Sequence, residues 1–191
     1  MNSTKLHTCI MKRKNYIVID LIQTIVVYLF VAIILTSYWG TSVVSSLSME
    51  PTLNKGALLI ISRQPEKIDY DDIITFLPKS EVPKLGGLLG DIAIRVNGQE
   101  VYVKRVVGLP GDSIEVKNGD LIRNGTVIHS DYTAETKITL YDMSPVLIPA
   151  GHYFVMGDNR NNSIDSHIFG PISGVQIYGK VIWSFKLPVD I

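Results

Sequence analysis

The chain has 191 residues, 46% of them hydrophobic, which fits one modest domain with its own core plus a short appendage. Its 18 basic and 18 acidic side chains give a formal net charge of zero, so no basic surface is expected to bind nucleic acid. Its single cysteine, Cys9, excludes an intramolecular disulfide and a multi-cysteine metal site.

Residues 16–39 form an almost entirely apolar run. As a helix rising about 1.5 Å per residue, this run is long enough to cross a hydrocarbon core about 30 Å thick. A buried core helix seldom has so unbroken an apolar surface, and a cleavable signal peptide has a shorter apolar region that ends at small residues. This run ends at Tyr38 and Trp39, which are typical of a membrane interface. We therefore expect an uncleaved transmembrane anchor.

Basic residues flank only one end of this run. Lys12, Arg13 and Lys14 precede it, whereas no lysine or arginine occurs from Tyr16 to Glu50. By the positive-inside rule, residues 1–15 are expected in the cytoplasm and residues 40–191 outside the membrane. The predicted localisation is the cell membrane, with a single pass and an extracytoplasmic working domain.

Beyond the apolar run, short β-type segments alternate with turn signals. The segments expected to form strands are 57–62, 73–76, 92–96, 101–107, 113–117, 120–123, 152–156 and 177–185. Asn118-Gly119 and Asn124-Gly125 predict tight turns. Residues 79–90 are expected to form a loop and residues 130–149 a polar excursion between strands. The predicted fold class is therefore a mostly β, antiparallel-sheet domain preceded by one N-terminal transmembrane helix.

Three segments of this domain, 45–53, 102–112 and 157–167, place polar and small residues among apolar strands. The chain has no G-x-S-x-G, S-x-x-K or H-E-x-x-H motif, and its four histidines lack metal-ligand spacing, so neither a metal nor a cofactor is expected. On a strand, Lys104 and Arg105 point to opposite faces, so one of them must face the apolar interior. A lysine in that position is costly unless it is used.

The three segments read S-x-S-M-x-P-T-L, Y-V-K-R-V-V-G-x-P-G-D and G-D-N-R-x-x-S-x-D-S. Together with the strand-like segment 72–76, they resemble, in order, the sequence boxes of type I signal peptidases, in the compact Gram-positive form. The resemblance implies a β-rich domain of the signal-peptidase type. It also implies a membrane-bound serine endopeptidase that removes N-terminal signal peptides after A-x-A-like sites. Its partners would be precursor proteins that carry signal peptides and the lipid bilayer.

The resemblance further implies roles for individual residues. Ser48 corresponds to the nucleophile and Lys104 to its general base. Ser46 corresponds to a hydroxyl that stabilises the oxyanion, and Ser163 to a serine that hydrogen-bonds to the base lysine. The residues that correspond to the braces of the site are Asp158, Arg160 and Asp165. Those that correspond to the lining of shallow pockets for small side chains are Val44, Met49, Leu53, Tyr102 and Val103.

A serine–lysine pair makes a clear physical demand on the lysine. A serine hydroxyl is a weak nucleophile unless a neighbour takes its proton, and a free lysine with a pKa near 10.4 is almost always charged at pH 7. Burial can lower a lysine pKa by up to about 3–5 units. We therefore predict that Lys104 is largely buried and has no carboxylate within ion-pair distance.

One residue departs from the family pattern. The third box is usually followed by arginine, and this chain has His167. An arginine could hold Asp165 by a permanently charged two-point pair, which histidine cannot do at neutral pH. The departure therefore bears on the bracing of the site and not on the serine–lysine dyad.

Other classes of function fit parts of the pattern. A non-catalytic signal-peptidase-like chaperone or scaffold in surface-protein assembly, for example of pili, would keep the fold but need not keep Ser48 and Lys104. A self-cleaving serine–lysine regulator related to the SOS repressors is cytosolic and carries a DNA-binding domain, which the apolar run and the zero net charge oppose. A purely structural anchored β domain gives no account of three polar segments in family order.

Overall fold

The structure, a computed structural model, describes residues 3–77, 101–129, 131–132 and 141–186. The chain divides into two compact units, Met1–Tyr38 and Trp39–Ile191. The strand predicted at 92–96 and the loop predicted at 79–90 lie outside the described residues.

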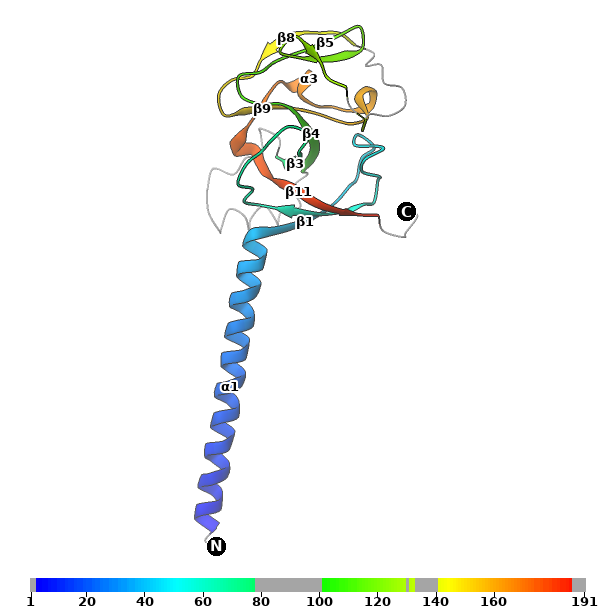
Figure 1. The fold of residues 1–191 in the computed structure, drawn as a ribbon. Coiled ribbons are helices and arrows are strands. Elements are labelled where there is room, and N and C mark those ends of the chain that lie inside the picture. Colours follow the sequence, from blue (N-terminus) through cyan, green and yellow to red (C-terminus); the bar gives the residue numbers. More distant parts are fainter. Residues whose placement is uncertain (1–2, 78–100, 130, 133–140, 187–191) are drawn as a thin grey trace. The chain divides into compact units, whose positions relative to one another are not determined.

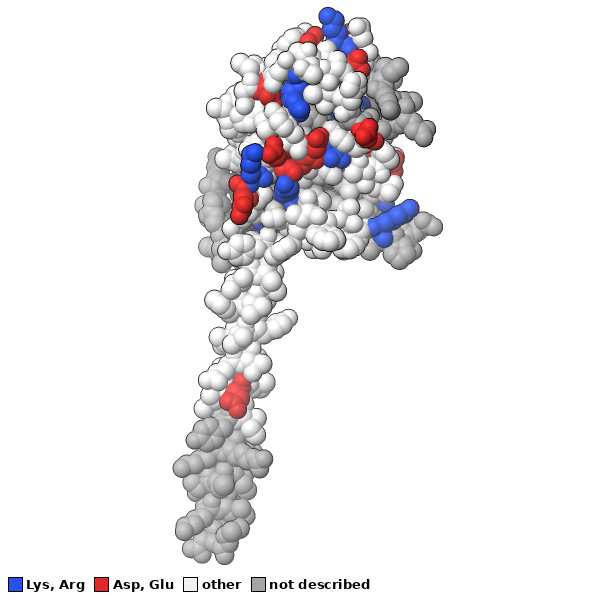
Figure 2. Space-filling model, viewed as in Figure 1, with Lys and Arg blue, Asp and Glu red and all other residues white. Residues whose placement is uncertain are grey.

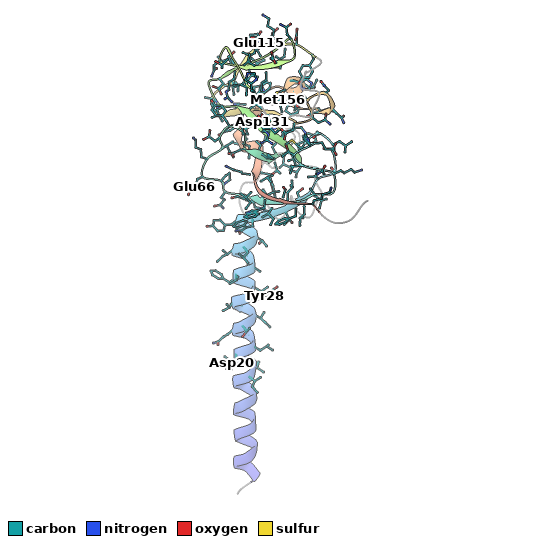
Figure 3. The ribbon with its side chains drawn as sticks, turned by 45° about the vertical axis from the view of Figure 1, so that its right-hand side comes forward. Asp20, Tyr28, Glu66, Glu115, Asp131 and Met156 are labelled. Carbon is teal, nitrogen blue, oxygen red and sulfur yellow. The ribbon has the colours of Figure 1, made fainter. Side chains whose placement is uncertain are left out.

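The first unit is a single helix, α1 (Ser3–Tyr38). Its stretch Ile17–Tyr38 has 22 residues and a mean hydropathy of 2.6, and none of its most apolar window is buried in protein. Asp20 is the only charged residue in this stretch, and the face of the described helix that Figure 2 shows is mostly white, so it carries few charged side chains. Asp20 and Tyr28 both project outward from the helix (Figure 3). The stretch thus has the length and composition needed to cross a membrane, without the burial of a core helix.

The second unit is built from two antiparallel sheets (Figure 1). The first sheet has the order β1-β2-β11-β3-β4-β9-β10 and the second the order β7-β6-β5-β8. The strands of the first sheet are β1 (Trp39–Val43), β2 (Leu58–Ser62), β11 (Ile177–Phe185), β3 (Ile73–Phe76), β4 (Tyr102–Gly108), β9 (His152–Met156) and β10 (Ile172–Ser173). Those of the second sheet are β7 (Thr126–Val127), β6 (Asp120–Arg123), β5 (Ser113–Lys117) and β8 (Met143–Leu147). The described helical turns of this unit are η2 (Arg160–Asn162), α3 (Ser166–Phe169) and η3 (Gly174–Gln176).

The predicted mostly β, antiparallel fold with one N-terminal apolar helix is confirmed. Seven of the eight predicted strands agree with the structure to within one residue at each end: β2, β3, β4, β5, β6, β9 and β11. The eighth, at 92–96, is the one outside the described residues. Both predicted tight turns are present, and the positive φ angles of Asn118 and Asn124, 51° and 52°, are those that such turns require.

The prediction that residues 130–149 form only a polar excursion is wrong, because β8 lies within it. Pro145 hid this strand, since proline cannot donate to a sheet ladder. β8 tolerates it as an edge strand, and its register with β5 shifts between Ile114 and Val116, opposite Pro145. The sequence also gave no sign of β1, β7 or β10. Trp39, placed in the anchor by the sequence, begins β1, and α1 ends at Tyr38.

Strand β4 lies inside the first sheet, between β3 and β9. Its side chains reach three apolar clusters: Val103 packs against one, Val106 belongs to a second and Val107 to a third. The third cluster joins the two sheets, because Phe154 and Met156 of β9 share it with Ile114 and Val116 of β5. Both faces of β4 are therefore covered, and every residue from Lys104 to Gly108 is buried.

Candidate active site

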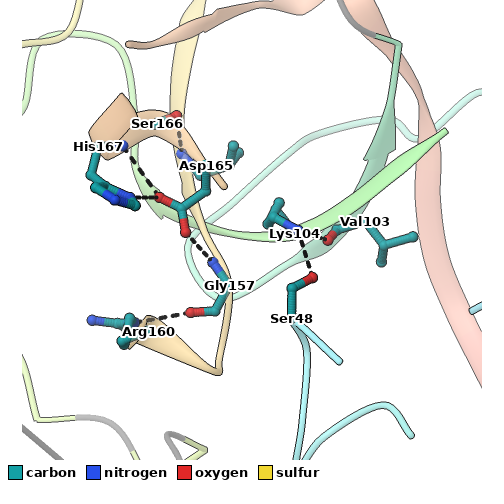
Figure 4. A network of polar contacts seen from close by, with 9 residues as sticks. Ser48, Val103, Lys104, Gly157, Arg160, Asp165, Ser166 and His167 are labelled. Carbon is teal, nitrogen blue, oxygen red and sulfur yellow. Dashed lines mark hydrogen bonds and ion pairs between the residues drawn. The ribbon is translucent and has the colours of Figure 1, made fainter. Parts of the chain in front are cut away.

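Ser48 lies in the loop after β1, and Lys104 lies on β4, where it is paired with Ile74 of β3. The Nζ atom of Lys104 is 2.7 Å from Oγ of Ser48 and 3.1 Å from the carbonyl oxygen of Val103 (Figure 4). Ser48 is only 6% exposed and Lys104 only 4%. The fold thus brings a buried amine and a buried hydroxyl, 56 residues apart in sequence, into hydrogen-bond contact.

The surroundings of Lys104 favour its neutral form. Burial lowers the pKa of Lys104 below its ordinary value, and the more distant charges of Asp165 and Asp158 oppose this shift. Among the described residues, no carboxylate forms an ion pair with Lys104. The prediction that Lys104 is largely buried agrees with this environment.

Arg105, the next residue on β4, is buried on the opposite face. Its guanidinium contacts both carboxylate oxygens of Asp158, at 2.8 and 2.7 Å, and donates to the carbonyl of Asp71 at 2.8 Å. The guanidinium also stacks on the ring of Tyr132, 3.8 Å from its centroid. The sequence led us to expect that either Lys104 or Arg105 faces the interior; in fact both do, because the sheet is covered on both faces.

Asp165 is fully buried, and its carboxylate contacts both Gly157 and His167 (Figure 4). Its Oδ2 accepts a hydrogen bond from the backbone N–H of Gly157 at 2.9 Å, and its Oδ1 lies 2.7 Å from Nδ1 of His167. Arg160 donates from Nε to the carbonyl of Gly157 at 3.1 Å. His167 thus reaches Asp165 through one ring nitrogen, in place of the two-point, permanently charged pair that an arginine could make.

The two supporting serines differ in their contacts. Ser46 Oγ lies 3.1 Å from Ser48 Oγ, next to the predicted nucleophile. Ser163 lines the pocket that also contains Ser48 and Lys104. Its buried hydroxyl has no hydrogen-bond partner among the described residues. The expected hydrogen bond from Ser163 to Lys104 is therefore not made in this structure. The Ser163 side chain instead packs against Gly157, so closely that a Cβ on Gly157 would lie 2.3 Å from Ser163 Oγ.

A pocket of about 590 Å³ opens over the serine–lysine pair. It is lined by residues 43–49, 101–104 and 161–164. Four of the five residues expected to contact substrate line it: Val44, Met49, Tyr102 and Val103. The fifth, Leu53, does not line this pocket; it is 2% exposed and packs in the apolar cluster behind Met49.

Sequence reasoning assigned no role to two residues that contact this site. Asn159 donates its backbone N–H to the carbonyl of Ser48 at 3.1 Å and its side-chain amide to the carbonyl of Leu47 at 3.2 Å. Tyr141 stacks on the ring of His167, with centroids 4.2 Å apart. Asn159 lies inside the third polar segment, which was a usable signal. Tyr141 lies in the segment interpreted as a polar excursion, where no pattern singles it out.

Fold and site together define a β-sheet protein with a serine–lysine pair at the floor of a pocket. The family model for signal peptidase, peptidase S26, matches residues 18–186. The chain belongs to this family.

Individual relatives agree with this assignment. The chain is 37% identical over 145 residues to a probable signal peptidase I-1 of Synechocystis sp., covering 72% of this chain and 66% of that protein. It is 33% identical over 154 residues to the chloroplastic thylakoidal processing peptidase 1 of Arabidopsis thaliana, covering 78% of this chain and 42% of that protein. It is 34% identical over 167 residues to signal peptidase I P of Bacillus subtilis subsp. natto, covering 81% of each. The chain thus spans less than two thirds of the length of the first two relatives. All three names describe peptidases, so a non-catalytic scaffold is not favoured.

Proposed function

We propose that the chain is a membrane-bound serine endopeptidase that removes N-terminal signal peptides from exported precursor proteins after A-x-A-like sites. The observation that carries this proposal is the 2.7 Å contact between the buried Lys104 amine and the Ser48 hydroxyl, at a pocket open to an extended chain. The names of the relatives, signal peptidases and a processing peptidase, support the same reaction.

In this mechanism, neutral Lys104 accepts the proton of the Ser48 hydroxyl as Oγ attacks the scissile carbonyl carbon. The tetrahedral intermediate then collapses, the peptide C–N bond breaks, and the Lys104 ammonium returns the proton to the leaving amine. An acyl ester between Ser48 and the signal peptide remains. Water, deprotonated by Lys104, hydrolyses this ester and regenerates the serine. Burial of Lys104 supports the steps in which it accepts a proton, because burial lowers the pKa of Lys104 and so favours the neutral amine.

The negative charge on the substrate oxygen needs hydrogen-bond donors in place before the reaction. We assign this role to the backbone N–H of Ser48 and the hydroxyl of Ser46. The 3.1 Å distance between Ser46 Oγ and Ser48 Oγ supports the assignment, because it puts the second hydroxyl beside the reacting oxygen.

The lining of the pocket supports a preference for small side chains. Val44 and Met49 are 5% and 1% exposed, so they form a packed floor rather than an adaptable one. Tyr102 and Val103 come from the opposite side, on β4. An extended peptide between residues 43–49 and 101–104 could add backbone hydrogen bonds as a β-strand does, with alternate side chains directed into the pocket.

Residues 16–38 form the proposed transmembrane anchor, because Trp39 already begins β1, with residues 1–15 in the cytoplasm and residues 39–191 as the extracytoplasmic catalytic domain. The apolar stretch Ile17–Tyr38 and the basic residues before it support this topology. The proposed partners are therefore the bilayer and precursors with signal peptides.

Cleavage of a model precursor tests the reaction. The full chain in detergent micelles is incubated with a precursor that carries an A-x-A site, as wild type, Ser48→Ala, Lys104→Ala and Lys117→Ala. We expect losses on the order of 10³-fold or more in the first two variants. The matched control is Lys117→Ala, which changes an exposed lysine on β5 and should cleave the precursor at the wild-type rate. Processing that persists in Ser48→Ala or Lys104→Ala would rule the proposed mechanism out.

The single cysteine offers a test of topology. In intact cells, Cys9 should react with a membrane-impermeant maleimide only after permeabilisation. In the double variant Cys9→Ser, Ser144→Cys, the new thiol lies at an exposed position of β8 and should react without permeabilisation. The opposite labelling pattern would reverse the proposed orientation.

A further inference from the structure

His167 lies between a buried carboxylate and an aromatic ring. Its Nδ1 is 2.7 Å from Oδ1 of Asp165, and its ring stacks on that of Tyr141 with 14° between the planes. The side chain of His167 is 12% exposed and that of Asp165 is 0% exposed. Because an ionised carboxylate only accepts hydrogen bonds, Nδ1 must carry the hydrogen, in a neutral imidazole or an imidazolium.

Asp165 connects this imidazole to the loop that holds Ser48. Its other oxygen accepts the backbone N–H of Gly157 at 2.9 Å. Gly157 packs so tightly against the nucleophile loop that a Cβ on it would lie 2.5 Å from the Ser48 carbonyl oxygen. That same oxygen accepts the backbone N–H of Asn159 at 3.1 Å. The polar contacts drawn in Figure 4 thus include a path from His167 through Asp165 to Gly157, beside Ser48.

We propose that His167 is a positioning residue: its Nδ1–H fixes the Asp165 carboxylate, which in turn fixes the turn at Gly157 and Asn159 against Ser48. This inference rests on the proposed peptidase function for its effect on rate. Its structural part, the fixed turn, is independent of that function. The α3 turn that carries His167 is itself held to β9, because Ser166 Oγ accepts the backbone N–H of Val155 at 3.0 Å.

The side chain at position 167 also contributes to the charge around Asp165. Among the described residues, the titratable groups that face the imidazole are Asp165, from its own turn, and Tyr141, across the stacked rings. Burial raises the pKa of the Tyr141 phenol well above its ordinary value, so Tyr141 stays neutral. The guanidinium of Arg160 interacts electrostatically with Tyr141 and contacts the Gly157 carbonyl. The charge of Asp165 opposes deprotonation of Lys104. A permanent cation at position 167 should offset part of that charge at alkaline pH.

Three variants separate the hydrogen bond from the charge. His167→Asn keeps an N–H donor near the Nδ1 position, and we expect kcat within about threefold of wild type. His167→Leu keeps an apolar contact with Tyr141 but removes the donor, and we expect kcat to fall on the order of tenfold or more with KM little changed. His167→Arg should move the acid limb of the kcat/KM profile to lower pH by roughly half a unit or more. His129→Arg, which adds the same charge at an exposed histidine, should leave the profile in place.

Hydrogen exchange gives a readout that does not need activity. The Gly157 amide should be equally protected in wild type and His167→Asn and should exchange faster in His167→Leu. Equal losses of rate and protection in the Asn and Leu variants would overturn the inference, as would a pH profile of His167→Arg that superimposes on wild type. If protection of the Gly157 amide depends on an N–H donor at position 167 while the wild type cleaves no precursor, the positioning role of His167 stands and the proposed function fails. If the wild type cleaves and Gly157 protection ignores the donor, only the positioning role fails.

Discussion

Arg105 and Asp158 form a two-point ion pair beneath the strand that carries Lys104, with contacts of 2.8 and 2.7 Å and side chains 9% and 1% exposed. Arg105 follows Lys104 immediately in sequence but lies on the other face of β4, where it meets Asp158 from the loop after β9. It satisfies one of the two carboxylates whose charge opposes deprotonation of Lys104. The site can therefore hold buried acidic groups near the lysine that we propose as the general base.

Removal of one partner of the Arg105–Asp158 pair should lower the stability of the protein. We expect Asp158→Ala to lower the free energy of unfolding by about 3–5 kcal/mol, because it leaves the Arg105 guanidinium buried without its partner. The double variant Arg105→Met, Asp158→Leu should lose less than Asp158→Ala alone, since it removes both charges. Denaturant unfolding of the wild type and of both variants measures these differences. The exposed pair Lys67–Asp69, at 74% and 47% side-chain exposure, is the control, and Lys67→Ala should have no measurable effect. A double variant less stable than the single one would contradict this account.

Lys104 should be a site where activity costs stability. Burial of its ammonium is unfavourable, so Lys104→Met should raise the stability at pH 7 by about 1 kcal/mol while it abolishes cleavage. Thermal unfolding and the precursor assay, run on the same preparation, measure both effects. A Lys104→Met variant that is less stable than wild type would show that the amine makes a net favourable contribution to folding.

The same lysine predicts two pH dependences of the same sign. The pKa of Lys104 is lowered in the folded state from an ordinary value of 10.5. Between the lowered pKa and 10.5, the unfolded chain binds more protons, so stability rises with pH across this window and is lost as pH falls through it. Activity should rise through the same folded-state pKa, because only the neutral amine accepts the serine proton. Unfolding of wild type and Lys104→Met across this range should differ by a slope that only the wild type has. A rate that is flat with pH, or that falls on the alkaline side of neutrality, would count against Lys104 as the base.

Removal of the Ser46 hydroxyl should destabilise the transition state more than it weakens substrate binding. We expect Ser46→Ala to reduce kcat by about 10²–10³-fold with KM nearly unchanged, the loss typical of one oxyanion donor. Ser144→Ala, at an exposed position on β8, is the control for loss of a hydroxyl elsewhere. A loss that appears in KM instead would mean that Ser46 contacts the substrate in its ground state.

Gly157 tolerates no side chain without movement of the nucleophile loop. A Cβ there would lie 2.5 Å from the carbonyl oxygen of Ser48 and 2.6 Å from Cβ of Ser163. Because the first of these is a backbone atom, Gly157→Ala should displace Ser48 and reduce kcat on the order of 10²-fold. Gly174→Ala, whose Cβ would approach no closer than 3.3 Å to a neighbour, is the matched control. Equal activity of the two variants would show that the loop can move without cost.

The sequence predicted those parts of the fold that depend on local patterns. Short β-type runs between turn signals indicated strands such as β5 and β6. Asn-Gly pairs indicated the turns that follow these strands, because turn geometry depends on only a few residues. The edge strand β8 escaped detection, since Pro145 reads as a loop residue unless the register beside it is known. Strand β1 escaped because its first residue, Trp39, continues an apolar run.

The sequence by itself predicted which side chains carry the proposed chemistry: a serine and a lysine in segments of family order, after an apolar run long enough to span a bilayer. Only the tertiary structure decided how they meet. Sheet pairing covers both faces of β4, so Lys104 and Arg105 are buried together, one beside a hydroxyl and the other beside a carboxylate. The fold also leaves Ser163 without a hydrogen bond to Lys104. These outcomes depend on distances between segments far apart in the chain, which no local pattern of residues specifies.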